Sequence, residues 1–168
     1  TAAITDELTG LYNRRGFFAL AEHQFRLANR TNRHMSLLYL DLDNMKGIND
    51  RFGHQIGDEA LQDAARILQQ TFRQSDIIGR IGGDEFAVLL IEHTDSNIED
   101  LISEHIRRNV YLHNRESRRK YYLSLSIGIV HYTQESPHTF SDLLIQADAA
   151  MYKDKRHRKL YAFKEKQK

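Results

Sequence analysis

Near its middle the chain reads Ile77-Ile-Gly-Arg-Ile-Gly-Gly-Asp-Glu-Phe-Ala-Val-Leu-Leu-Ile91. Two apolar runs, 77–81 and 85–91, flank the pair Gly82-Gly83. Glycine accepts the positive φ that tight primed turns require, so this pattern predicts a β-hairpin. The two acidic residues that follow the glycines are expected at the turn.

A strand is also predicted over residues 36–43, which end in the turn-prone Asn44. Its side chains alternate between two faces, with Leu38, Leu40 and Leu42 on one and Tyr39, Asp41 and Asp43 on the other. We expect the end of this strand to lie beside the Gly82-Gly83 turn at the centre of a sheet.

The remaining pattern predicts helices over about 15–31, 59–72, 97–114 and 140–155, a strand over 121–131 and a short last strand over 160–163. From residue 36 the order begins β-α-β-β-α-β, the arrangement of ferredoxin-like α+β folds. We therefore expect a central, mainly antiparallel, five-stranded sheet flanked by helices. The helices are expected on one face, which leaves the other partly free for ligand.

Composition and length fit one domain spanning residues 1–168, with 40% hydrophobic and 28% charged residues. A net charge of +1 gives no overall field that favours nucleic acid or membrane. Cysteine is absent, which excludes disulfides and thiolate metal sites and fits a reducing compartment. No apolar run approaches 18 residues, so we expect a cytoplasmic fragment without direct membrane contact. We expect it to be cut from a longer signalling protein, where any membrane anchor would lie.

Four carboxylates make a candidate metal site. Asp41 and Asp43 should project from one strand face roughly 6–7 Å apart, close to Asp84 and Glu85 at the turn. Such charges repel unless a cation offsets them, and hard oxygen ligands favour Mg²⁺ or Mn²⁺. An Asp-x-Asp pair alone is more often a solvated strand end, so the prediction rests on both motifs lying on neighbouring elements.

Other residues suit a nucleotide. The backbone at Gly82 and Gly83 allows a base or a phosphate chain to approach closely. Asn49 and Asp58 offer the donors and acceptors that read a guanine edge. The triphosphate oxygens have three candidate cations, namely Lys46, Lys155 and Lys159.

Taken together, these residues resemble the bacterial GGDEF domain over nearly the whole chain. The matching motifs are Asp6-x-Leu-Thr-Gly-Leu-x-Asn-Arg-Arg15, Asp41-Leu-Asp43 with Lys46, Asn49-Asp50, Phe52-Gly-His54, Gly57-Asp-Glu59, Arg80-Ile-Gly-Gly-Asp-Glu-Phe86, Ser126-Ile-Gly128, Ala147-Asp148, Met151-Tyr152 and Lys155. The resemblance implies a palm-like fold similar to that of adenylyl cyclases and polymerases. It also implies a diguanylate cyclase, which condenses two GTP into cyclic di-GMP and two pyrophosphates.

The resemblance assigns roles to the site residues. Asp41, the carbonyl of Leu42 and Asp84 would hold the divalent metals. Glu85 would assist metal binding and deprotonate the ribose 3′-hydroxyl, so the expected catalytic residues are Glu85, Asp84 and Asp41. Asn49 and Asp58 would bind guanine, Gly82 and Gly83 would make room for the nucleotide, and the lysines would contact phosphates. Because each domain binds one GTP, catalysis would need a second GGDEF domain in a homodimer.

Arg73-Gln-Ser-Asp76 fits the family's Arg-x-x-Asp product-inhibition motif, where guanidinium and carboxylate would bind cyclic di-GMP. By itself Arg-x-x-Asp is common and usually an exposed pair. The family often has a further inhibitory-site arginine after the hairpin. His105 and Arg107 lie near that position, and neither is assigned to the role.

The chain departs from the family's Lys-x-x-Gly-Arg-Asn pattern, with Arg158, Lys159 and Leu160 in place of its last three residues. Lysine keeps the charge of arginine but loses its bidentate fork. An alternative is therefore a catalytically silent module that binds GTP or cyclic di-GMP and regulates a neighbouring domain. A structural or nucleic-acid-binding ferredoxin-like domain would leave the acidic cluster unexplained.

Overall fold

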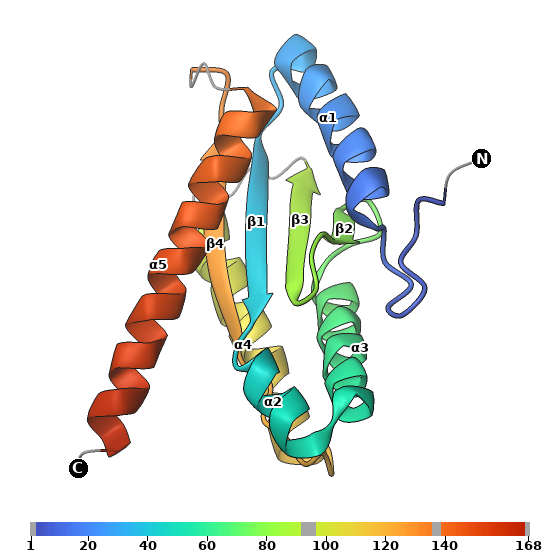
Figure 1. The fold of residues 1–168 in the computed structure, drawn as a ribbon. Helices are drawn as coiled ribbons and strands as arrows, with labels where there is room; N and C mark the ends of the chain where they lie inside the picture. Colours follow the sequence, from blue (N-terminus) through green and yellow to red (C-terminus); the bar gives the residue numbers. More distant parts are fainter. Residues whose placement is uncertain (1–2, 92–96, 136–138, 167–168) are drawn as a thin grey trace.

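The protein is described by a computed structural model that covers residues 3–91, 97–135 and 139–166 (Figure 1). Its strands are β1 (Met35–Leu42), β2 (Ile77–Arg80), β3 (Glu85–Ile91) and β4 (Leu125–Tyr132). Its helices are α1 (Arg14–Thr31), α2 (Met45–Phe52), α3 (His54–Thr71), α4 (Ile98–Glu116) and α5 (Phe140–Lys166). None of these helices combines the length and the apolar character that crossing a bilayer requires.

The strands form one antiparallel sheet in the order β2-β3-β1-β4. This order confirms the ferredoxin-like β-α-β-β-α-β arrangement and the predicted hairpin. In the register of the central pair, Asp41 lies opposite Glu85, and on the other side Asp41 lies opposite Ser126. The end of β1 therefore lies beside the hairpin turn, as predicted.

Helices cover both faces of the sheet, so the prediction of one partly free face is wrong. One face packs Leu38, Leu40 and Leu42 against α3 and α4, whereas the other packs Met35 and Leu37 against α1 and α5. Figure 1 shows α1 and α5 in front of the strands with α3 and α4 behind them. With both faces covered, ligands can reach the sheet only at the ends of its strands and at its edges.

The short strand predicted over 160–163 does not form, and the described sheet has four strands instead of five. Helix α5 continues to Lys166. Between 140 and 166 the sequence has neither glycine nor proline, the residues that most often end a helix. Arg158 occupies the position where the GGDEF pattern has glycine, and this substitution removes the expected stop.

Helix α2 was not predicted, and α3 begins at His54 instead of near residue 59. Asn44 adopts the left-handed conformation at the N-cap of α2, with φ of 59°. Gly53 separates α2 from α3 with φ of 90°, a value that favours glycine. The two helices thus form a tight corner directly after β1.

The hairpin turn does not depend on a left-handed glycine. Among the described glycines only Gly10 and Gly53 have positive φ, so the conformational reason proposed for Gly82-Gly83 is wrong. Arg80 holds the turn instead, because its Nη2 and Nε donate to the Gly83 carbonyl at 2.9 and 3.2 Å. Its Nη1 also pairs with Asp6 at 3.2 Å, which joins the N-terminal motif to the turn.

The N-terminal segment runs along the outer edge of β2. Tyr12 forms a parallel bridge with Gly79, and its carbonyl accepts the Arg80 amide at 2.8 Å. The Tyr12 amide donates in turn to the Ile78 carbonyl at 3.3 Å. These bonds satisfy backbone groups of β2 that β3 does not reach.

Candidate active site

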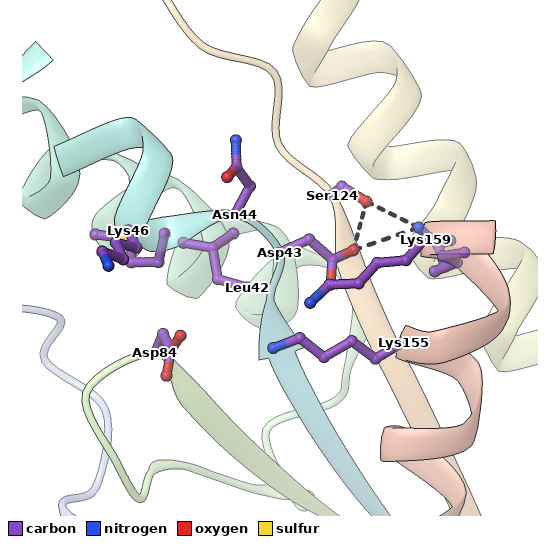
Figure 2. Close-up of a pocket in the computed structure, with 10 residues that line it drawn as sticks. Leu42, Asp43, Asn44, Lys46, Asp84, Ser124, Lys155 and Lys159 are labelled. Carbon is purple, nitrogen blue, oxygen red and sulfur yellow. Dashed lines mark hydrogen bonds and ion pairs between the residues drawn. The ribbon is translucent and has the colours of Figure 1, made fainter. Parts of the chain in front are cut away.

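A cavity of about 640 Å³ opens where β1 ends, between the hairpin turn, α2 and α5 (Figure 2). Its lining residues are Leu42, Asp43, Asn44, Met45, Lys46, Asp84, Ser124, Lys155, Arg158 and Lys159. Four of these side chains are cationic and two are acidic. The cavity therefore carries an excess of positive charge beside an acidic strand end, a combination suited to an anion held together with a metal ion.

Asp41 is the most buried acid at this strand end, with 5% of its surface exposed. Its Oδ2 accepts a 2.5 Å hydrogen bond from Lys155 Nζ, whereas its Oδ1 has no hydrogen-bond partner in the described structure. Burial raises the pKa of Asp41 to about 6; the Lys155 ammonium opposes this rise, and the charge of Asp84 adds to it. The site thus holds a carboxylate that lacks part of the cationic compensation it needs.

Backbone hydrogen bonds fix Asp84 beside this carboxylate. The Leu42 amide donates to the Asp84 carbonyl at 2.9 Å, which ties the hairpin turn to the last residue of β1. Lys155 remains a cation here: burial favours the neutral amine, but the hydrogen bond and charge of Asp41 outweigh it and raise the pKa of Lys155. In Figure 2 the Lys155 side chain extends from α5 toward Asp84.

Asp43 is directed toward β4 and does not join the other acids. Its Oδ2 accepts from Ser124 at 2.6 Å and its Oδ1 accepts from Ser126 at 2.5 Å. Arg158 Nη1 lies 3.6 Å from Asp43 Oδ2. Burial raises the pKa of Asp43, and the two serine hydroxyls act against that rise. The expected convergence of four carboxylates is therefore wrong in this arrangement, in which Asp41 lies near Asp84 and Asp43 is bound by serines.

Glu85 is held by a tyrosine of the neighbouring strand. The Tyr39 hydroxyl donates to Glu85 Oε2 at 3.1 Å. Tyr39 lies two residues before Asp41 on the same face of β1, the face covered by α1 and α5, and Glu85 is the register partner of Asp41 on β3. Burial, with the charge of Glu85, raises the pKa of Tyr39, so the phenol stays protonated and remains a donor.

A hard divalent cation fits this strand end by the chemistry of its donors. Asp41 Oδ1 is buried without a partner, Asp84 lies close by, and Lys155 already places a positive charge on Asp41. Within the described ranges no three His, Cys, Asp or Glu side chains are gathered closely enough to hold a metal ion. Metal ligation by Asp41, the Leu42 carbonyl, Asp84 and Glu85 therefore remains a prediction, and it requires the carboxylates to shift toward a common centre.

The predicted guanine ligands lie on the corner formed by α2 and α3. Asn49 is half-buried on α2, and its Oδ1 is buried without a hydrogen-bond partner in the described structure. Gly57 on α3 lies against it, since a Cβ at Gly57 would meet that oxygen at 1.9 Å. Asp58 is the next residue and is exposed. Neither Asn49 nor Asp58 lines the cationic cavity, so the two predicted subsites are separate neighbouring features.

The other predicted substrate contacts are accessible. Lys46 on α2 and Lys159 on α5 are exposed and line the cavity from opposite sides. Gly83 is exposed at the turn with nothing within 4 Å of a Cβ built on it, whereas a Cβ on Gly82 would meet Glu85 Oε2 at 2.8 Å. Gly82 thus allows Glu85 to fold back against the turn.

Arg73 and Asp76 differ in their availability to a ligand. Arg73 has 64% of its side chain exposed, beside a cavity of about 490 Å³ that both residues line. The Asp76 side chain is 1% exposed, and its carboxylate accepts the amides of Arg73 and Ile91 at 3.0 and 3.3 Å. In this structure Asp76 holds the loop before β2. The exposed Arg73 guanidinium donates to the Ile91 carbonyl at 3.1 Å and lies 3.9 Å from Asp76 Oδ2.

Comparison with protein families gives a match to the model described as "Diguanylate cyclase, GGDEF domain" over residues 3–160. The chain belongs to the GGDEF domain family. It is 38% identical over 162 residues to diguanylate cyclase DgcP of Escherichia coli K12, covering 95% of this chain and 46% of that protein. It is 35% identical to a diguanylate cyclase of Vibrio cholerae, covering 92% and 47%. The chain thus spans less than half the length of these curated relatives.

Solved GGDEF domains have the same fold. The GGDEF domain of DgcB from Caulobacter crescentus, determined in complex with c-di-GMP, superposes with a TM-score of 0.83 at 28% identity, covering 94% of this chain and 92% of that one. The GGDEF domain of PA1120 (TpbB or YfiN) from Pseudomonas aeruginosa has a TM-score of 0.82 at 38% identity, covering 91% and 89%.

Several residues of this GGDEF domain were not predicted from sequence. Tyr39, Ser124 and Ser126 orient the acidic side chains, and Arg158 reaches the cavity that Lys159 was expected to serve. A signal existed for the serines, since they alternate along the strand like Asp41 and Asp43. Arg158 had none, because a mid-helix arginine is ordinarily a solvated side chain.

Proposed function

We propose that this GGDEF domain is a diguanylate cyclase, which condenses two GTP molecules into cyclic di-GMP and releases two pyrophosphates. The observation that carries the proposal is the buried Asp41 carboxylate, whose Oδ1 lacks a partner in the described structure while Asp84 lies near it. The adjacent cavity is lined by four cationic side chains and suits a triphosphate. Supporting this, the family model covers residues 3–160 of the chain.

The chain's residues divide the work. Asn49 and Asp58 hold the guanine, while Lys46, Lys155 and Lys159 hold the phosphates. Asp41, the Leu42 carbonyl, Asp84 and Glu85 hold Mg²⁺ or Mn²⁺, which supplies positive charge to the reacting phosphate oxygens when bound. Glu85, fixed by Tyr39, accepts the proton of the ribose 3′-hydroxyl. A second copy of the domain presents the other GTP, because one domain holds one nucleotide.

Product inhibition is part of the proposal. The exposed Arg73 guanidinium binds a phosphate or guanine edge of cyclic di-GMP at the 490 Å³ cavity, and Asp76 keeps the loop in place through two backbone hydrogen bonds. Arg73→Ala is expected to relieve inhibition by added product without lowering the initial rate. Equal inhibition of both proteins would remove Arg73 from this role.

The deciding experiment is incubation with GTP and Mg²⁺, with the products separated by chromatography. The comparison is wild type, Asp84→Ala, and Asp100→Ala as a matched control at an exposed acid of α4. We expect cyclic di-GMP from wild type and the control at a rate that rises faster than linearly with protein concentration, and none from Asp84→Ala. GTP binding without turnover, even in a forced dimer, would select the silent binding module instead.

A further inference from the structure

Arg158 is the single guanidinium among the lining residues of the 640 Å³ cavity. It lies three residues after Lys155, on the same face of α5, and next to Lys159 in sequence, and its side chain is 31% exposed. The cavity therefore contains one guanidinium that can bind a phosphate through two parallel N–H donors, in addition to three lysine ammonium groups.

Most of the hydrogen-bonding capacity of Arg158 is unused. Its Nη1 donates to Ser124 Oγ at 2.8 Å, and this is its one hydrogen bond to the described residues. A guanidinium carries five N–H donors, so four are available. The contacts with Asp43 at 3.6 Å and Asp154 at 3.4 Å are ion pairs beyond ordinary hydrogen-bond length.

The two acids beside Arg158 do not depend on it for hydrogen bonds. Ser124 and Ser126 donate to the two oxygens of Asp43. Asp154 accepts the Ile127 amide at 2.8 Å at the outer edge of β4. Arg158 can therefore turn from Asp43 to an anion in the cavity without leaving either carboxylate unsatisfied.

We infer that Arg158 binds the phosphate chain of the nucleotide and supplies the bidentate contact that Lys159 cannot make. The identity of the nucleotide rests on the proposed function. The expectation that the ligand is an oligophosphate anion rests on the cationic lining of the cavity. Loss of one charge-assisted bidentate contact is expected to weaken binding about tenfold.

The test measures binding by calorimetry with Mg²⁺ present and without turnover. The ligands are a non-hydrolysable GTP analogue, GMP and inorganic tripolyphosphate, and the proteins are wild type, Arg158→Gln and Arg158→Lys. Arg156→Gln is the matched control, since Arg156 is exposed on the same helix and lies outside the cavity lining. Thermal unfolding checks that each variant is folded.

We expect Arg158→Gln to lose about tenfold in affinity for the GTP analogue and tripolyphosphate, and less than about twofold for GMP. Arg158→Lys should fall between wild type and Arg158→Gln, and Arg156→Gln should match wild type. Equal loss for all three ligands, or no loss for any, would overturn the inference. Arg158-dependent binding of tripolyphosphate without binding of guanine nucleotides would keep the inference and remove the proposed cyclase. Failure of wild type to bind any of them would overturn both.

Discussion

The Lys155 ammonium lies 2.5 Å from Asp41 Oδ2, so α5 places a positive charge on the buried acid of β1. Asp84 lies close enough to Asp41 to raise its pKa, and this repulsion is what the ammonium offsets. Lys155 therefore offsets the negative charge of Asp41 and Asp84, as a bound divalent cation would also do.

Replacing Lys155 with methionine should destabilise the metal-free protein by about 2 kcal/mol, because a buried carboxylate loses its cationic partner. Added Mg²⁺ should restore more stability to Lys155→Met than to wild type, since the metal then offsets the charge alone. Thermal unfolding with and without MgCl₂ measures both effects. Lys153→Met, at an exposed site on the same helix, is the control. An equal gain in stability from Mg²⁺ in Lys155→Met and in wild type would contradict cation binding at Asp41.

Tyr39→Phe removes a single oxygen and with it the donor to Glu85 Oε2. We expect the rate of product formation to fall about fivefold, the effect of one hydrogen bond of about 1 kcal/mol, with little change in the KM for GTP. Glu85 keeps its charge but loses its fixed orientation. Steady-state kinetics separates kcat from KM, and an unchanged kcat would contradict a positioning role for Tyr39.

Asp63→Asn is expected to cost about 3 kcal/mol of folding free energy, because it breaks a buried ion-pair network. Asp63 on α3 is 2% exposed, forms ion pairs with Arg66 and Arg119, accepts the Tyr121 hydroxyl and lies 3.3 Å from His113 Nε2. This network holds the segment that leads into β4 and so positions Ser124. Urea unfolding measures the loss. The exposed control Asp100→Asn should change stability by less than about 1 kcal/mol, and a similarly small loss in Asp63→Asn would refute the network's importance.

His113 should make the folded state sensitive to mild acid. Burial lowers its pKa, Asp63 opposes that effect, and Arg119 and Arg66 add to it. The unfolded chain, whose histidine has the ordinary pKa of 6.5, therefore binds more protons than the folded chain just below that pH. Stability is expected to fall as pH drops through this window, and His113→Gln should lose less. Urea unfolding at about pH 7.5 and about pH 5.5 compares them; parallel losses would exclude His113 as the cause.

The sequence was sufficient to predict the parts of the fold that rest on strong local patterns. Two apolar runs flanking Gly82-Gly83 and the alternation around Asp41 identified the central strands and their adjacency, and both are confirmed. Helix α2 was not predicted because the segment 45–52 is short and largely polar and contains Gly47. The run 160–163 was misassigned because a short apolar run fits a strand and a helix equally well.

The candidate site was predictable as a list of residues but not as a geometry. Sequence spacing placed Asp41 and Asp43 on one face, and the structure confirms this, since both contact α5. Spacing could not show that serines of β4 would draw Asp43 away from Asp84, because those contacts join residues more than 80 positions apart. The pairing of Tyr39 with Glu85, which are 46 positions apart, could not be predicted from spacing for the same reason.

The N-terminal segment around Tyr12 also affects how the sheet edge can interact with other molecules. β2 is an outer strand, and such strands can recruit strands of other molecules through their free amides and carbonyls. Tyr12 occupies the amide of Arg80 and the carbonyl of Ile78, so β2 presents fewer free groups to a neighbour. The Asp6–Arg80 ion pair fastens this cover to the turn. The N-terminal motif therefore reduces the tendency of β2 to pair with other molecules, and it also supports the hairpin that carries Asp84 and Glu85.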